Sequence, residues 1–348
     1  MHHSDYCIAG AGIIGLSLAL ELHRRGATVT VLERSAPLAE ASYAAGGMLA
    51  SHDPENPAAL QPLADLSLSL YPIYLASIEA LSHLHVPFQT NLTLQSHPTS
   101  TPADIRPLLP QLIPGSHTFV RLEEHSIAPR QLGAALLTAV RSTSIALHLH
   151  TSVESVRSVG DSVEVLTATS TFSASHFIDC TGAWASASSN LPVGTIVPRK
   201  GQMLAVALPP SLPLDLVIRT PEIYIIPRTQ GPNAGHVVIG ATVEDRGFDK
   251  TVHSTDIAML QSRAAELLPQ LADATILETW AGLRPATADL LPLLGALPNH
   301  PRHLLATGHY RNGILLAPAT AHLMAQLLTS EIPTIDLAAF SPARVVGL

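Results

Sequence analysis

The chain has 348 residues, of which 47% are hydrophobic and 13% are charged, and its formal net charge at pH 7 is −8. This length allows a sizeable core and predicts two domains, and the hydrophobic content excludes a disordered chain. The acidic balance and the lack of lysine and arginine clusters argue against nucleic acid as a partner.

The cysteines, histidines and apolar runs point away from a metal centre or a membrane span. Cys7 and Cys180 lie in apolar strand-like runs, which favours buried free thiols. The 18 histidines show no metal-ligand spacing, so we expect no metal. The apolar run 314–328 is too short to cross a membrane and is interrupted by Pro318 and His322. Because no secretory signal precedes the first strand, a cytoplasmic protein without a membrane partner is expected.

Residues 5–34 predict a strand, a glycine turn, a helix and a second strand. Gly10, Gly12 and Gly15 have G-x-G-x-x-G spacing, which allows a tight turn, close approach of a pyrophosphate and close packing of helix on strand. The helix N-terminus offers free N–H groups to phosphates. Glu33 follows Gly12 by about 20 residues, where an acid binds a ribose 2′-OH. The stretch predicts dinucleotide binding and argues against NADP, but it leaves both FAD and NAD open.

Two unlike segments follow this unit. Residues 39–51 are small and lack periodicity; their position after the second strand favours a loop that closes over the nucleotide rather than a merely flexible one. Residues 58–84 have helical spacing, and Pro62 and Pro72 predict that the run is broken into shorter helices.

The remaining elements alternate between strands and helices. In chain order we expect a strand over 86–95, a loop with one helical turn over 98–115, a helix over 130–141, strands over 146–156, 162–169 and 171–180, short strands over 202–208, 216–220, 222–227 and 236–242, a helix over 255–268, strands over 276–282 and 304–308, and a last helix from Asn312 to about Ser330. The short strands predict a largely antiparallel sheet. The closing strand, turn and helix repeat the opening pattern. An α/β fold is therefore predicted, with a nucleotide domain that a second sheet domain interrupts.

Three stretches of the second half carry groups suited to an anion. They are YIIPR at Tyr224, WAGLRP with Arg284 near its end, and GHYRNGILLAP with Arg311. An arginine fixed at a strand end can bind a carboxylate through two parallel hydrogen bonds. In an unknown protein a surface ion pair explains such an arginine equally well.

Together with the N-terminal unit, these stretches resemble the FAD-dependent D-amino acid oxidase superfamily, and most closely its glycine oxidase branch from thiamine-thiazole biosynthesis. The shared motifs are IAGAGIIG, VLER, ASYAAGGMLA, DCTGAWA, PRKGQML, YIIPR, VVIGATVED, WAGLRPATAD and GHYRNGILLAPATA. The resemblance implies a Rossmann-type FAD-binding domain and a mainly antiparallel substrate domain. We assign 1–85, 128–195 and 280–348 to the FAD-binding domain, and 86–127 and 196–279 to the substrate-binding domain.

The resemblance also implies which residues bind FAD. They are Gly10, Gly12, Ile13, Ile14 and Gly15 at the pyrophosphate, Glu33 and Arg34 at the adenosine ribose, Val153 at the adenine, Ala41, Ser42, Gly46, Gly47 and Met48 along the flavin, and His309, Tyr310, Arg311, Asn312, Gly313, Ile314 and Leu315 around the isoalloxazine. The strand that ends before Gly182 suggests a second contact with the nucleotide, although it could equally be an ordinary strand end. Sarcosine-oxidase relatives attach FAD to a later cysteine, and none follows Cys180, so FAD should be bound non-covalently.

For the substrate, the resemblance implies that Arg284 binds the carboxylate, that Tyr224 donates its hydroxyl to the same group, and that Arg311 lies close by. Two departures leave the preference for glycine open. Val243 stands where the family can carry a longer methionine, and the region 95–122 is shorter than usual, which leaves open whether it forms a lid.

The implied activity is oxidative deamination of glycine, another small (D-)amino acid or sarcosine to an imine and 2-oxo acid, with oxygen as the acceptor and hydrogen peroxide as a product, in thiamine-thiazole biosynthesis. Three alternatives stay open: a D-amino acid dehydrogenase that passes electrons to a quinone, a nicotinamide-dependent imino acid reductase, and a non-catalytic dinucleotide-fold binding protein. The family tends to form homo-oligomers, but no sequence feature shows one here.

Overall fold

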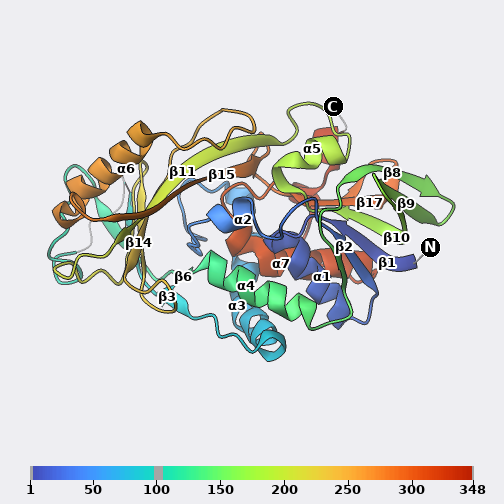
Figure 1. Cartoon of the computed structure of the whole chain (residues 1–348), viewed down its shortest axis with the longest axis horizontal. Helices are drawn as coiled ribbons and strands as arrows, with labels where there is room; N and C mark the ends of the chain where they lie inside the picture. Colours follow the sequence, from blue (N-terminus) through green and yellow to red (C-terminus); the bar gives the residue numbers. More distant parts are fainter. Residues whose placement is uncertain (1–2, 98–104, 347–348) are drawn as a thin grey trace.

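In the computed structural model, which describes residues 3–97 and 105–346, two large β-sheets lie toward opposite ends of the molecule (Figure 1). The first sheet has eight strands: β1 (His3–Ala9), β2 (Val29–Leu32), β7 (Ala146–His148), β8 (Val153–Val159), β9 (Ser162–Thr167), β10 (Thr171–Asp179), β16 (Leu293–Leu297) and β17 (His300–Thr307). Its central strands run in the order β7-β2-β1-β10-β17 and are parallel. The N-terminal strand therefore lies in the middle of the sheet, with strands from the centre and the end of the chain on one side.

The second sheet has seven strands: β4 (Thr93–Ser96), β5 (Phe119–Leu122), β11 (Val197–Ala207), β12 (Val217–Arg219), β13 (Tyr224–Arg228), β14 (His236–Gly240) and β15 (Ile276–Ala286). Its order is β15-β11-β14-β13-β12-β4-β5, and every pair except β12 with β4 is antiparallel. The largely antiparallel sheet expected from the short strands is confirmed. A small sheet pairs β3 (Phe88–Thr90) with β6 (Ser126–Ile127).

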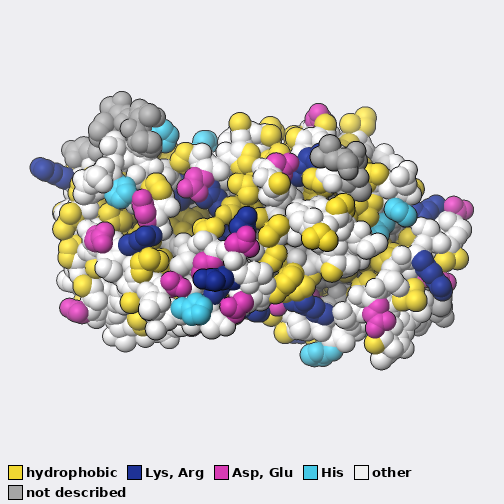
Figure 2. Space-filling model, turned by 90° about the horizontal axis from the view of Figure 1, so that it is seen from above, with side chains coloured by type: hydrophobic (Ala, Val, Ile, Leu, Met, Phe, Trp, Pro, Cys, Tyr) yellow, Lys and Arg dark blue, Asp and Glu magenta, His cyan; other side chains and the backbone are white. Residues whose placement is uncertain are grey.

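The helices pack on both sheets (Figure 1). They are α1 (Ile13–Arg24), α2 (Ala41–Ala44), α3 (Gln61–Ser82), α4 (Pro129–Arg141), α5 (Ala185–Ser188), α6 (Ser254–Leu267), α7 (Gly313–Leu328) and α8 (Ala343–Val346). No helix in the described part of the chain is both long and apolar enough to cross a membrane. On the face in Figure 2, acidic and basic side chains are interspersed.

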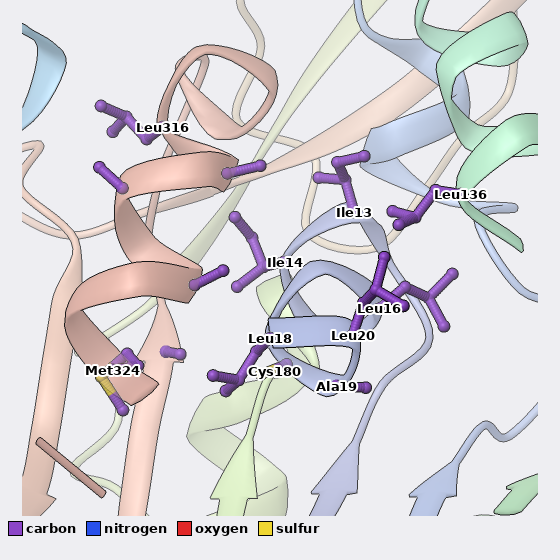
Figure 3. Close-up of a cluster of buried hydrophobic side chains, with 14 of the residues drawn as sticks. Ile13, Ile14, Leu16, Leu18, Ala19, Leu20, Leu136, Cys180, Leu316 and Met324 are labelled. Atoms are coloured by element: carbon purple, nitrogen blue, oxygen red, sulfur yellow. The ribbon is translucent and has the colours of Figure 1, made fainter. Parts of the chain in front are cut away.

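The main core lies between the first sheet and the helices α1, α3, α4 and α7. Figure 3 shows Ile14 of α1 beside α7, with Leu316 and Met324 on α7 itself. Two side chains of α3 hold the first turn of α7: Ser67 Oγ donates to Leu315 O at 2.6 Å, and Tyr71 Oη donates to Ile314 O at 2.5 Å. The last helix is thereby fixed near the carboxyl ends of the parallel strands, where β1 ends.

Three expectations about the elements are wrong. The run 58–84 is not broken: α3 continues through Pro72, and Pro62 lies in its first turn, where a missing N–H costs nothing. The expected strand 86–95 is two short strands, β3 and β4, in different sheets, and the expected strand 146–156 is divided between β7 and β8. Tertiary packing holds α3 together, since its buried residues face the core on both sides of Pro72. The expected strands divide because their halves pair with different partners: β3 with β6, β4 with β5 and β12, β7 with β2, and β8 with β9.

Two further expectations concern segments that the structure tests only in part. Residues 98–104 of the expected proline-rich loop lie outside the described residues, and 105–115 form turns. β15 crosses residue 280, which the sequence assigns to a domain boundary, and pairs along its length with β11. The proposed domain limits stay a prediction.

Close packing at Gly15 gives a test of the β1–α1 unit. A Cβ on Gly15 would lie 2.0 Å from Gly10 O, a backbone atom that cannot give way. We expect Gly15→Ala to lower the free energy of unfolding by about 3 kcal/mol, the upper range for overpacking. Denaturant unfolding followed by circular dichroism measures this loss.

Gly133→Ala in α4 is the matched control, because its added methyl meets the flexible end of Leu38 at 3.0 Å. In Gly133→Ala the free energy of unfolding should change by no more than about 1 kcal/mol, since alanine is the better helix former. Equal losses in the two variants would contradict the packing argument.

Candidate active site

A cavity of about 780 Å³ opens where the two sheets meet. Its walls come from the carboxyl ends of β1, β2 and β10, from α2 and its loop, from β13 and β15, and from the turn before α7. Ligands of open α/β sheets bind at this edge of the sheet. The cavity is of the size that small-molecule and cofactor sites have in proteins.

One end of the cavity is the glycine turn between β1 and α1. Gly10 has φ +100°, and a Cβ there would lie 2.6 Å from Cys180 O, so only glycine fits. Glu33 Oε2 accepts a hydrogen bond from Ala11 N at 2.8 Å, and Oε1 accepts one from Ser35 N at 2.9 Å. The carboxylate is therefore held beside the turn, at the end of β2.

The N-terminus of α1 also faces this end of the cavity. Gly12 is its N-cap and supplies no side chain, while Ile13 N donates to Ser42 Oγ at 2.9 Å. The remaining free N–H groups and the positive end of the helix dipole suit a phosphate.

Beyond Glu33, aromatic and charged side chains from three segments surround the adjoining wall. The guanidinium of Arg34 lies 3.6 Å from the centre of the Trp184 ring and 3.0 Å from Glu40. Phe248 stacks on Trp184 with ring centres 5.3 Å apart, and Lys250 pairs with Glu40 at 2.9 Å. These contacts join the loop after β14 to the end of the cavity that the glycine turn forms.

In another part of the cavity wall, Arg284 of β15 lies directly on Gly201 of β11. A Cβ on Gly201 would come within 2.4 Å of both terminal nitrogens of the guanidinium. Nη1 donates to Thr242 O at 3.1 Å and to Lys200 O at 3.4 Å. Within the described residues, no carboxylate oxygen lies within 4.0 Å of the Arg284 guanidinium, which is the limit for an ion pair. Arg284 is therefore a half-buried cation in the cavity wall without a counter-ion.

Tyr224 lies next to Arg284 and covers Gly240, where an added Cβ would meet its hydroxyl oxygen at 2.5 Å. Burial raises the pKa of the Tyr224 phenol, and the guanidinium groups of Arg284 and Arg228 partly offset this effect. The phenol is therefore a protonated donor at neutral pH.

Arg311 also lines the cavity, but its charge is paired. It lies 3.0 Å from Asp53 Oδ1 and also contacts Glu55 Oε2. Asp53 Oδ2 is 3.6 Å from Arg219, which in turn pairs with Glu124 at 3.1 Å. This chain of ion pairs ties the 53–55 loop to the turn before α7 and to β12.

His309 is buried in that turn. It is 3% exposed, and its Nε2 lies 3.0 Å from Thr320 Oγ1. Burial lowers the pKa of His309 to about 3, so the imidazole is neutral at physiological pH.

The cavity brings together most residues that the sequence assigned to cofactor and substrate. The lining includes Gly10, Gly12, Ile13, Ile14, Glu33, Arg34, Ala41, Ser42, Gly46, Gly47, Met48, Val153, Gly182, Tyr224, Val243, Arg284, His309, Tyr310, Arg311, Asn312, Gly313 and Ile314. Gly15 and Leu315 do not line it: both are buried, Gly15 against Gly10 and Leu315 in the main core.

Sequence reasoning missed Asp53, Glu55, Arg219 and Trp184 as lining residues. Trp184 was within reach, because it directly follows the small turn after β10 in DCTGAWA. The other three have no local signature, since their partners come from distant parts of the chain.

The residues present fit FAD. The glycine turn leaves backbone open to a pyrophosphate, Glu33 lies at the ribose position of a Rossmann fold, and the loop with α2 forms a further wall. Both cysteines are buried free thiols, as expected. Burial raises the pKa of Cys7 to about 12 and raises that of Cys180, so neither is a reactive thiolate.

Comparison with known proteins agrees with this geometry. Residues 5–327 match the DAO family, described as FAD dependent oxidoreductase. The chain is 38% identical to a bifunctional protein ThiO/ThiG of Trichormus variabilis, over 94% of this chain and 53% of that protein, so it spans about half of that relative. It is 32% identical to a glycine oxidase of Pseudomonas aeruginosa, over 97% of this chain and 98% of the relative. A crystal structure of glycine oxidase from Geobacillus kaustophilus superimposes with a TM-score of 0.89 at 29% identity and covers 98% of both chains.

The neutral state of His309 has a consequence for stability. Its pKa is lowered from an ordinary 6.5 to about 3, so the unfolded chain takes up a proton below pH 6.5 that the folded chain does not. Stability should therefore fall as the pH falls, and this one group should contribute about 2 kcal/mol of the loss between about pH 7 and pH 5. His309→Gln should show a shallower decline in denaturant unfolding measured across this range.

His85→Gln serves as the control, because the side chain of His85 is 70% exposed. The free energy of unfolding of His85→Gln should fall between pH 7 and pH 5 as much as that of the unmodified protein. If His309→Gln declined as steeply as the control, the buried imidazole would not be the neutral group described above.

Proposed function

Since the chain belongs to the family of FAD-dependent oxidoreductases, we propose that it oxidises glycine or another small (D-)amino acid or sarcosine to the imine. Water then hydrolyses the imine to a 2-oxo acid and ammonia, or methylamine where sarcosine is the substrate, and oxygen takes up the two electrons and two protons as hydrogen peroxide. The observation that carries this proposal is Arg284, a cation without a counter-ion in the wall of a cavity that fits FAD. A substrate carboxylate would be its partner.

FAD, when bound, would supply the two-electron acceptor, and the chain would position the substrate. Arg284 would bind the carboxylate and fix the orientation of the Cα–H bond, which lowers the entropic part of the barrier. Tyr224 would donate its hydroxyl to the same carboxylate. Arg311 would contribute less directly, because Asp53 and Glu55 already pair with it. No side chain would need to act as a base if the substrate amine is neutral.

For the cofactor we propose the roles that the sequence implied. Gly10, Gly12 and the start of α1 would bind the pyrophosphate, and Glu33 with Arg34 would hold the adenosine. Residues 41–48 and 309–314 would enclose the flavin, with the positive end of α7 directed toward it. Gly15 and Leu315 would act through packing rather than by contact.

The names of the relatives support the substrate class and the place in metabolism. Relatives named glycine oxidase match along 97% or more of their length, and ThiO/ThiG proteins match over about half of theirs. We therefore propose that the enzyme functions in thiamine-thiazole biosynthesis. Oxygen rather than a quinone as the acceptor, a cytoplasmic location and a homo-oligomeric state are predictions from sequence and family resemblance.

Removing the guanidinium of Arg284 tests the proposal. Arg284→Ala should raise the KM for the best small amino acid and lower kcat/KM by about 100-fold or more, because each hydrogen bond to a charged group contributes about 1.5–3 kcal/mol. FAD content should not change. Peroxide formation in air, measured against glycine, sarcosine, D-alanine and D-proline, provides the assay.

Arg199→Ala is the matched control. Arg199 lies opposite Arg284 in the register of the neighbouring strand β11. Its guanidinium forms an ion pair with Asp245 at 3.1 Å, and it does not line the cavity. Its kinetics should stay unchanged. Unchanged kinetics in Arg284→Ala, or no peroxide with any of the four substrates, would refute the proposed function.

A further inference from the structure

Arg228 is a second cation near the cavity without an acidic partner. It ends β13 and is 6% exposed. Its Nη2 donates to Gly46 O at 2.8 Å, and its Nη1 donates to Ile127 O at 3.4 Å. In the described part of the chain, no carboxylate oxygen lies within 4.0 Å of the Arg228 guanidinium, the limit for an ion pair. Two backbone carbonyls are thus its protein partners.

The neighbouring strand shows what a buried arginine ordinarily requires. Arg219 on β12 is 4% exposed, and it lies 3.1 Å from Glu124 and 3.6 Å from Asp53. An isolated buried charge is costly, and proteins usually pair it. Arg228 stays a cation at neutral pH all the same, since burial lowers its pKa only to about 10. Within the described residues this cation therefore has two carbonyl partners and no counter-charge.

The contacts of Arg228 connect it to the cavity wall. Gly46, whose carbonyl it binds, lines the cavity together with Gly47 and Met48. Gly47 is fixed as well, because its φ is +88° and a Cβ there would lie 2.0 Å from Ile127 O. Arg228 binds carbonyls on both sides of this close contact. Its charge is therefore one peptide group behind the wall at which we place the flavin.

Two cations without an acidic partner are therefore associated with this cavity: Arg284 lines it, and Arg228 lies behind its wall. Both Arg228 and Arg284 are close enough to Tyr224, the first residue of β13, to influence the pKa of its phenol. A substrate carboxylate supplies one negative charge and has a direct partner in Arg284. The positive charge of Arg228 has no negative counterpart until another negative charge forms in the cavity.

We propose that Arg228 is a fixed positive charge that stabilises FAD in its two-electron reduced form and so raises the midpoint potential of the flavin. Two electrons and one proton added to FAD leave one negative charge, which oxygen removes when it takes the electrons. Positive charge near the flavin ring favours the reduced state. This inference rests on the placement of the flavin beside residues 46–48 under the proposed function.

The midpoint potential of the bound flavin tests the inference. Reduction by dithionite against a reference dye needs no amino acid substrate, so the result is independent of whether the substrate proposal is right. In Arg228→Gln the equilibrium should shift at least tenfold toward oxidised FAD, which is about 30 mV for a two-electron couple. Arg228→Lys, which keeps the charge, should stay within about threefold of the unmodified protein. Equal shifts in both variants, or no shift in either, would overturn the proposal.

Arg130→Gln is the matched control. Arg130 is close enough to influence the pKa of Arg228, but Glu278 pairs with it at 2.6 Å and 2.9 Å. Its removal should leave the potential unchanged, and a shift as large as that of Arg228→Gln would count against a specific role for Arg228.

Loss of FAD from Arg228→Gln would not prevent the test. Fluorescence titration of the apoprotein with oxidised FAD, and with reduced FAD under argon, gives the same quantity through the ratio of the two dissociation constants. The proposal requires reduced FAD to lose at least ten times more affinity than oxidised FAD. Equal losses would show that Arg228 only shapes the 46–48 loop.

Discussion

The site depends on the contact between the guanidinium of Arg284 and the bare backbone of Gly201. Any side chain at 201 would displace the guanidinium, and β11 and β15 must pair in register to bring the two together. A second glycine on the same strand pair, Gly282, admits the α2 loop, because a Cβ there would lie 2.3 Å from Ala44 Cβ. Two glycines thus let a cation and the α2 loop approach one cavity. Without an acidic partner, that cation has its full charge available for a ligand.

The nucleotide side follows from a different constraint. Parallel pairing places the ends of β1, β2, β10 and β17 along one edge, where the glycine turn, Glu33, the turn at Gly182 and the turn before α7 all meet. The strands concerned come from the beginning, the middle and the end of the chain. The walls of the cavity therefore come together only when distant segments have paired, and hydrogen bonds from Ser67 and Tyr71 hold the closing helix in its place.

The sequence predicted what has a local signature. The G-x-G-x-x-G turn with Glu33, the helices 130–141 and 255–268 and the antiparallel sheet were all expected, because spacing and periodicity reflect neighbours along the chain. Pro72 misled the prediction of α3, since packing on both sides of the proline holds the helix together. Asp53 could not be assigned to Arg219 and Arg311, nor could Arg228 be seen to lack a carboxylate, because such pairings are settled by tertiary structure.

An anaerobic titration of the FAD-loaded protein tests the central claim most directly. The visible absorbance of oxidised flavin is followed while the best substrate among glycine, sarcosine and D-alanine is added, and then in a second sample while its carboxamide is added. If an unpaired guanidinium binds the substrate through its carboxylate, the amino acid should bleach the flavin and the carboxamide should not at the same concentrations. Equal bleaching by both compounds, or none by any amino acid, would contradict this account.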